Sequence, residues 1–231
     1  MLTHPLSGLH ARSIIRSEID RLLTLSVLFS IGMAVIRVMH TGKSNFLFMI
    51  WNLFLAYIPY ALTKWLSTRE SLSRKIPVFI PLFLTWLFFI PNTFYIITDL
   101  FHLGDHYNDR LMPQWFDLAM ILSFVWNGFL LGVLSVRQME KILQPLLPAH
   151  NELFFLYPIM WLNALGVFTG RYLRYNSWDV LTNPFQLLID IGDMLIHPLR
   201  YRGDWYMIFC YSILMTLMYL MLKKISKVFA Q

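Results

Sequence analysis

The sequence is poor in cysteine and in charge, and each shortage excludes a large class of protein. Its 231 residues include one cysteine, Cys210, inside an apolar run, so the sequence offers neither a disulfide framework nor a thiolate metal site. Charged residues make up 14% of the chain and hydrophobic residues 57%. Soluble domains are about one quarter charged and about one half apolar. The composition therefore predicts an integral membrane protein.

The signatures of several enzyme classes are absent from the sequence as well. It contains no G-x-S-x-G nucleophile elbow, no phosphate-binding P-loop, no dinucleotide fingerprint and no H-E-x-x-H zinc spacing. The formal charge of +6 does not indicate nucleic acid, because the basic residues stand in short clusters between apolar runs. We therefore expect no nucleic-acid partner, and the sequence identifies neither a cofactor nor a reaction.

Six apolar runs are long enough to cross a membrane, and the basic residues beside them predict their direction. With both termini in the cytoplasm, 12 of the 19 Lys and Arg fall on the cytoplasmic side and 7 outside, which is the expected bias. The first run contains Arg37 and is followed by no A-x-A-like cleavage site, so we expect it to be a retained span. We predict an all-α, polytopic membrane bundle, a single domain over residues 1–231, in the plasma membrane, specifically a bacterial inner membrane. The predicted spans are residues 22–39, 46–62, 76–97, 115–136, 153–170 and 205–222.

The segment between the fifth and sixth runs is too polar to cross a membrane and too apolar to be a free loop. Pro184 is well placed to begin a helix. From there one face is apolar and the other carries Gln186, Asp190, Asp193 and His197. We therefore predict an interfacial amphipathic helix over residues 184–197.

Small residues recur at helical spacing in two of the predicted spans. Gly128 and Gly132 share a face of the fourth span, and Gly166 and Gly170 share a face of the fifth. Small side chains at this spacing let membrane helices approach closely. We therefore expect both pairs to lie in helix contacts.

The run PNTFYIITDLFHLGDH, which begins at Pro91, changes abruptly from apolar to polar. At about 100° per residue, one helix edge would carry Asn92, Tyr95, Asp99, His102 and His106. Asp and His can bind a divalent metal or relay protons. Asp99 and His102 are therefore the candidate catalytic residues, and Asp99, His102 and His106 the candidate metal ligands. The alternative interpretation is a solvated helix end.

Two further groups of polar residues are candidates for ligand binding. Asp190, Asp193 and His197 could form a site on the predicted interfacial helix, or only its wet face. The second group is suited to phosphate or carboxylate groups and to the headgroup layer, although an Arg–Asp pair with an aromatic belt would explain it equally well. Its members are Arg171, Arg174, Asn176, Trp178 and Asp179.

Three strings in the chain carry a family resemblance: PNTFYIITDLFHL at Pro91, WFD at Trp115 and GRYLRYNSWD at Gly170. Together they resemble a family of bacterial multi-pass membrane proteins catalogued as domain of unknown function 1361. The resemblance implies an integral membrane protein. It brings no substrate, cofactor or catalytic residue to these positions.

Three functions fit these patterns, and whether the protein is an enzyme stays open. The leading hypothesis is an extracytoplasmic Asp/His/Arg site that binds or processes a phosphate-bearing or lipid-linked substrate. In the second, a small transporter or conducting subunit would move protons or cations through Asp99 and Asp117. In the third, a structural subunit of a membrane complex would dock through its glycine-bearing faces. The expected partner is the lipid bilayer, with a lipid-linked or phosphate-bearing small molecule under the leading hypothesis, and the oligomeric state is not predicted.

Overall fold

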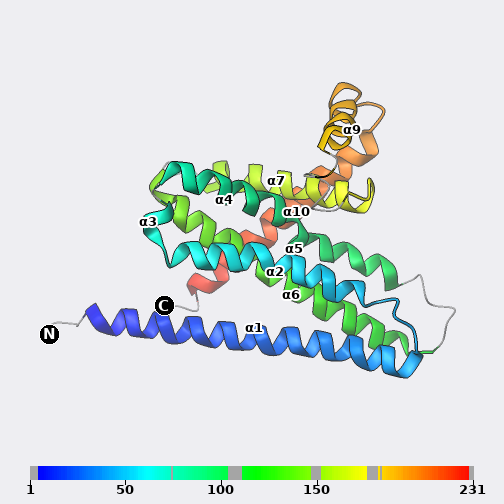
Figure 1. Cartoon of the computed structure of the whole chain (residues 1–231), viewed down its shortest axis with the longest axis horizontal. Helices are drawn as coiled ribbons and strands as arrows, with labels where there is room; N and C mark the ends of the chain where they lie inside the picture. Colours follow the sequence, from blue (N-terminus) through cyan, green and yellow to red (C-terminus); the bar gives the residue numbers. More distant parts are fainter. Residues whose placement is uncertain are drawn as a thin grey trace. The chain divides into compact units, whose positions relative to one another are not determined.

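The computed structural model describes residues 5–73, 75–103, 111–146, 152–175, 182 and 184–228, and every element in these ranges is a helix (Figure 1). The predicted all-α class is therefore confirmed. The elements are α1 (Pro5–Thr41), α2 (Phe48–Ser67), α3 (Glu70–Ser73), α4 (Ile76–Phe89), α5 (Pro91–Tyr95), the 3₁₀ helix η1 (Ile96–Leu103), α6 (Gln114–Leu143), the 3₁₀ helix η3 (Gln144–Leu146), α7 (Glu152–Arg171), α9 (Pro184–Ile196) and α10 (Arg202–Val228).

Five stretches of helix are long and apolar enough to cross a membrane, so the protein is a multi-pass membrane protein. They are Glu18–Thr41, Ile76–Leu103, Gln114–Leu143, Leu153–Arg171 and Arg202–Val228. Helix α2 covers the predicted second span and has 20 residues, but it is not among the five. Its sequence includes Asn52, Pro59 and Lys64. The predicted second span, residues 46–62, therefore stays a prediction.

Burial follows the pattern expected in lipid, where apolar side chains face outward and polar groups face other helices. Exposed side chains include Phe29, Phe154 and Leu217, whereas Asn127 and Asn163 are fully buried. Since a soluble protein of this composition would hide those apolar groups, the burial supports the assignment made from helix length.

The chain forms two compact units. Unit 1 comprises residues 1–51 and 99–127, and unit 2 comprises residues 52–98 and 128–231. In unit 1, α1 lies antiparallel to the first part of α6. The amide of Asn127 donates to the carbonyl oxygen of Ser26 (3.1 Å) and to Ser30 Oγ (2.9 Å), and the Arg37 guanidinium pairs with Asp117.

In unit 2, both glycine pairs contact the same short segment, α5 and the residue after it. A Cβ atom on Gly166 would lie 2.6 Å from two ring carbons of Pro91, and one on Gly132 would lie 2.5 Å from Thr93 Oγ1. Gly128 approaches the same segment from α6, and Gly170 approaches it from α7. The expected close helix contacts are therefore confirmed, and they hold α5 between α6 and α7.

The span that contains α5 is broken. Proline at position 91 has no N–H to donate, and α4 ends two residues before it. Side chains bond to the carbonyls around the break: the Asn92 amide donates to Phe89 O (2.9 Å), Thr93 Oγ1 to Ile90 O (2.7 Å) and Thr98 Oγ1 to Tyr95 O (2.7 Å).

The α-helical stripe predicted from Asn92 onward is wrong beyond Tyr95, because the chain continues as a 3₁₀ helix from Ile96 to Leu103. A 3₁₀ helix has three residues per turn, so residues three apart lie directly above one another. Asp99 and His102 therefore still share an edge. Runs of this helix longer than three or four residues are uncommon and often mark a functional hinge or strain.

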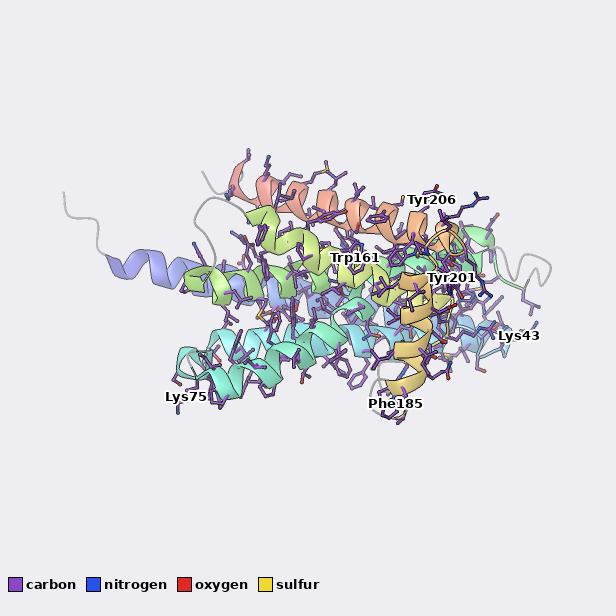
Figure 2. The ribbon with its side chains drawn as sticks, turned by 90° about the horizontal axis from the view of Figure 1, so that it is seen from above. Lys43, Lys75, Trp161, Phe185, Tyr201 and Tyr206 are labelled. Carbon is purple, nitrogen blue, oxygen red and sulfur yellow. The ribbon has the colours of Figure 1, made fainter. Side chains whose placement is uncertain are left out.

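Helix α9 stands at one end of unit 2. Figure 2 shows it running across the direction of α7 and α10, with Phe185 and Tyr201 at the end opposite Lys75. Helices α7 and α10 run side by side, and the rings of Trp161 and Trp205 stack between them with centroids 6.1 Å apart. The bounds of α9 agree with the predicted helix over residues 184–197 to within one residue.

Candidate functional site at helix α9

The two aspartates of α9 each accept a hydrogen bond from a tyrosine on a neighbouring segment. Tyr175, which follows α7, donates to Asp190 Oδ2 (2.7 Å), and Tyr201, which precedes α10, donates to Asp193 Oδ2 (2.5 Å). Gln186 donates to the other oxygen of Asp190 (2.9 Å). Both aspartates are half-buried. This edge of α9 is therefore bonded to the protein itself.

Each of these tyrosines directly follows an arginine. The pairs are Arg174–Tyr175 and Arg200–Tyr201, and they bond to aspartates that lie three residues apart on α9. Residues three apart on a helix share a face. Helix α9 thus holds two Arg-Tyr dipeptides, from segments distant in the sequence, along one edge.

The backbone at Arg174 has a left-handed conformation, with φ of 61°. This conformation costs a non-glycine residue about 1–2 kcal/mol. It turns the chain so that the Tyr175 N–H donates to the carbonyl of Thr169 (3.1 Å), which closes the end of α7. The bond from Tyr175 to Asp190 helps offset the cost.

Arg200 is held loosely beside Asp193. Its Nη1 lies 3.9 Å from Asp193 Oδ2, and His197 Nε2 lies 3.6 Å from Asp193 Oδ1. Both distances exceed that of a hydrogen bond, and the Arg200 side chain is 72% exposed. Exposed pairs of this kind contribute little to stability. The guanidinium of Arg200 therefore keeps donors for another partner.

The hydrogen bond to Asp193 raises the pKa of Tyr201, and burial raises it further, whereas the nearby Arg200 lowers it. The net effect is a pKa above the usual value near 10. Tyr201 therefore remains a hydrogen-bond donor at neutral pH.

The opposite face of α9 is apolar and exposed. Phe185 is 78% exposed and Ile196 is 73% exposed. The other exposed members are Leu188, Ile189 and Leu195, and Leu199 follows the helix. Because the aspartates face the protein, the apolar face points away from it. This is the arrangement of a helix lying at a membrane surface.

The first predicted constellation is only partly described. Asp99 is fully buried, and the ring of His102 packs edge-on against Phe48, with centroids 5.1 Å apart. Both belong to unit 1, while Asn92, Tyr95, Arg171 and Arg174 belong to unit 2. The shared site therefore stays a prediction.

His106, Asn176, Trp178 and Asp179 lie outside the described residues. Within the described ranges, no group of three or more His, Cys, Asp or Glu side chains could hold a metal ion. The metal site at Asp99, His102 and His106 therefore also stays a prediction.

Sequence reasoning missed several polar partners. Asp117, a predicted proton carrier, forms a two-point ion pair with Arg37, with Nε–Oδ1 at 2.7 Å and Nη2–Oδ2 at 3.1 Å. The sequence signal for this ion pair is a single charged residue inside each of two apolar runs, Arg37 in the first and Asp117 in the fourth. Tyr175 and Tyr201 were missed too, although the repeated Arg-Tyr dipeptide marks both.

Comparison with protein families gives a match over most of the chain. The model of a family described as a protein of unknown function (DUF1361) matches residues 51–220. Comparisons with curated proteins and with solved structures gave no match.

Proposed function

The chain belongs to the DUF1361 family of proteins of unknown function, and we propose that it binds a phosphate-bearing, lipid-linked ligand at the extracytoplasmic face of the plasma membrane. In this proposal both termini are cytoplasmic, and α9 lies in the outer headgroup layer. Arg174 and Arg200 are the phosphate-binding groups, and Arg171 stands three residues before Arg174.

The observation that carries the proposal is the double anchoring of α9. Its exposed apolar face suits the boundary between headgroups and acyl chains. On its other edge, Asp190 and Asp193 fix the two tyrosines, and so fix the backbone beside Arg174 and Arg200. Arginine is the residue best suited to planar, two-point recognition of phosphate. A ligand with a lipid tail and a phosphate would contact both features.

The charge pattern supports the orientation. Lys75 lies at the end of unit 2 opposite α9 (Figure 2), and basic loops favour the cytoplasm. Reporter fusions after Arg69, Arg137 and Lys224 should give a cytoplasmic signal, and one near Asp179 an outside signal. An outside signal after Arg69 would overturn the orientation.

Ligand binding is tested on protein purified from membranes into nanodiscs. Lipid extracted from the protein should contain a phosphate-bearing species by mass spectrometry. The double variant Arg174→Gln with Arg200→Gln should lose most of it. Lys75→Gln removes an exposed charge at the opposite end and serves as the control. Equal lipid recovery from all three proteins would refute the proposal.

We also propose Asp99 and His102 as the groups that would process such a ligand. Asp99 is fully buried, and buried ionisable groups in membrane spans are functional candidates by default. Asp99→Asn should then abolish conversion of the bound lipid without reducing its recovery. Unchanged conversion would exclude this role.

The second candidate function is proton or cation transport. One observation favours it: the span from Ile76 to Leu103 is discontinuous and carries the buried Asp99, as in transporters that bind substrate at broken helices. Gradient-driven flux into liposomes that Asp99→Asn abolishes would establish this function. An absence of flux in the wild type would remove it. Asp117 no longer suits such a role, because Arg37 neutralises it.

A further inference from the structure

A four-residue cluster joins α6 to α10 at the end of unit 2 that is remote from α9. The carboxylate of Glu140 accepts hydrogen bonds from Arg137 Nη1 (2.8 Å), from the Tyr219 hydroxyl (2.5 Å) and from Lys223 Nζ. Tyr219 and Lys223 are buried. We call these residues the Glu140 cluster.

Two side-chain contacts locate the cluster within unit 2. Thr63 bonds to Ser135 Oγ (3.2 Å) and to Gln138 Oε1 (2.9 Å), so the last turns of α2 and α6 lie together. From there α2 leads through α3 to Lys75, which Figure 2 places at the end opposite Tyr201. In the proposed orientation this end lies in the cytoplasmic leaflet.

The Glu140 cluster brings two cations to one carboxylate. Arg137 and Lys223 are cationic, Glu140 is anionic and Tyr219 is neutral. Lys223 is buried, whereas the Arg137 side chain is partly exposed. Arg137 is therefore the cation that an anionic partner could reach.

The cluster also has donors that an anion could reach. A guanidinium carries five N–H donors, and the Arg137 side chain is 34% exposed. Lys141 lies one turn further along α6, and Lys224 and Lys227 are exposed on α10. The ends of α6 and α10 near the cluster are therefore rich in basic residues.

We propose that the Glu140 cluster binds the phosphate of an anionic lipid headgroup in the leaflet opposite α9. Basic sites between membrane helices on the cytoplasmic side suit such headgroups. Glu140 neutralises part of the positive charge of Arg137 and Lys223, and the exposed N–H donors of Arg137 bind the phosphate. The acyl chains then lie along α6 and α10, whose outward apolar side chains include Ile213 and Leu217.

The test compares thermal unfolding in phosphatidylglycerol nanodiscs with unfolding in phosphatidylcholine nanodiscs. Each variant is compared with itself in the two lipids, so a general loss of stability cancels. Wild-type protein should unfold at a higher temperature in phosphatidylglycerol. Arg137→Gln should remove most of that difference and lower the affinity for phosphatidylglycerol, measured by native mass spectrometry, about tenfold. Arg137→Lys should retain part of it, and Lys227→Gln, an exposed control on α10, should retain nearly all of it.

Glu140→Gln separates the lipid site from a purely structural clamp. This variant raises the positive charge of the cluster, so its lipid-dependent difference should grow even though its stability in phosphatidylcholine falls. A clamp without a lipid would lose stability equally in both lipids, and that result would overturn the proposal. Stabilisation by inorganic phosphate in phosphatidylcholine equal to that by phosphatidylglycerol would also overturn it, because the ligand would then be a free anion.

Discussion

Replacing Gly166 by alanine tests the contact between α7 and the broken span most directly. The new methyl carbon would lie 2.6 Å from two ring carbons of Pro91, whereas carbon atoms pack at about 3.5–4.0 Å. The two segments must therefore separate by about 1 Å. A proline ring cannot turn aside as a flexible side chain can, so the backbone has to move.

The size of the effect follows from two opposing contributions. Overpacking a well-packed contact costs about 1–3 kcal/mol, and alanine in place of glycine favours a helix by about 1 kcal/mol. With two rigid contacts, we expect a net loss of about 1–2 kcal/mol in the free energy of unfolding. For a chain of this size that lowers the melting temperature by roughly 2–8 °C.

Thermal unfolding in detergent, followed by tryptophan fluorescence, measures the loss. Gly192→Ala in α9 is the matched control, because nothing lies within 4 Å of a Cβ atom at that position. The control should leave stability unchanged or raise it slightly. If Gly166→Ala behaves like Gly192→Ala, α7 and α5 do not pack as described.

Three further measurements test other parts of the structure. Gly170→Ala should cost less than Gly166→Ala in the same assay, because its neighbour is the ring of Tyr95 at 3.2 Å, which can shift; an equal loss would contradict this. Arg37→Gln and Asp117→Asn should each cost about 3–5 kcal/mol by leaving a buried charge without its partner, and the double variant should cost less than the sum; additive losses would argue against the pair. The raised pKa of Tyr201 favours its neutral form in the fold, so its contribution to stability should be present below pH 10 and lost as the pH rises through the raised value; an ultraviolet phenolate titration step at or below pH 10 that Tyr201→Phe removes would contradict it.

Patterns within a single element could be predicted from the sequence. The long apolar runs predicted helices at the positions of α1, α6, α7 and α10. The two-faced pattern from Pro184 predicted the bounds of α9 to within one residue. Each of these depends on neighbours a few positions away, which the sequence displays. The glycine spacing likewise predicted close helix contacts.

Features that depend on which elements meet could not be predicted. The sequence does not show that both glycine pairs meet the segment at Pro91, since that depends on how three helices pack together. It does not show that Asp190 bonds to Tyr175, fifteen residues before it, or that Arg37 neutralises Asp117. The change to a 3₁₀ helix at Ile96 was also missed, because the apolar pattern alone is compatible with either helix.

The side-chain hydrogen bonds near Pro91 also matter during synthesis of the chain, before the whole bundle has formed. The broken span is synthesised before α6 and α7, so it enters the lipid without the helices that later enclose it. Carbonyls left open in lipid cost several kcal/mol each. Asn92, Thr93 and Thr98 bond to carbonyls only three residues back, so these hydrogen bonds lie within the span and need no other helix. These hydrogen bonds can therefore form before the glycine faces of α6 and α7 pack against the span.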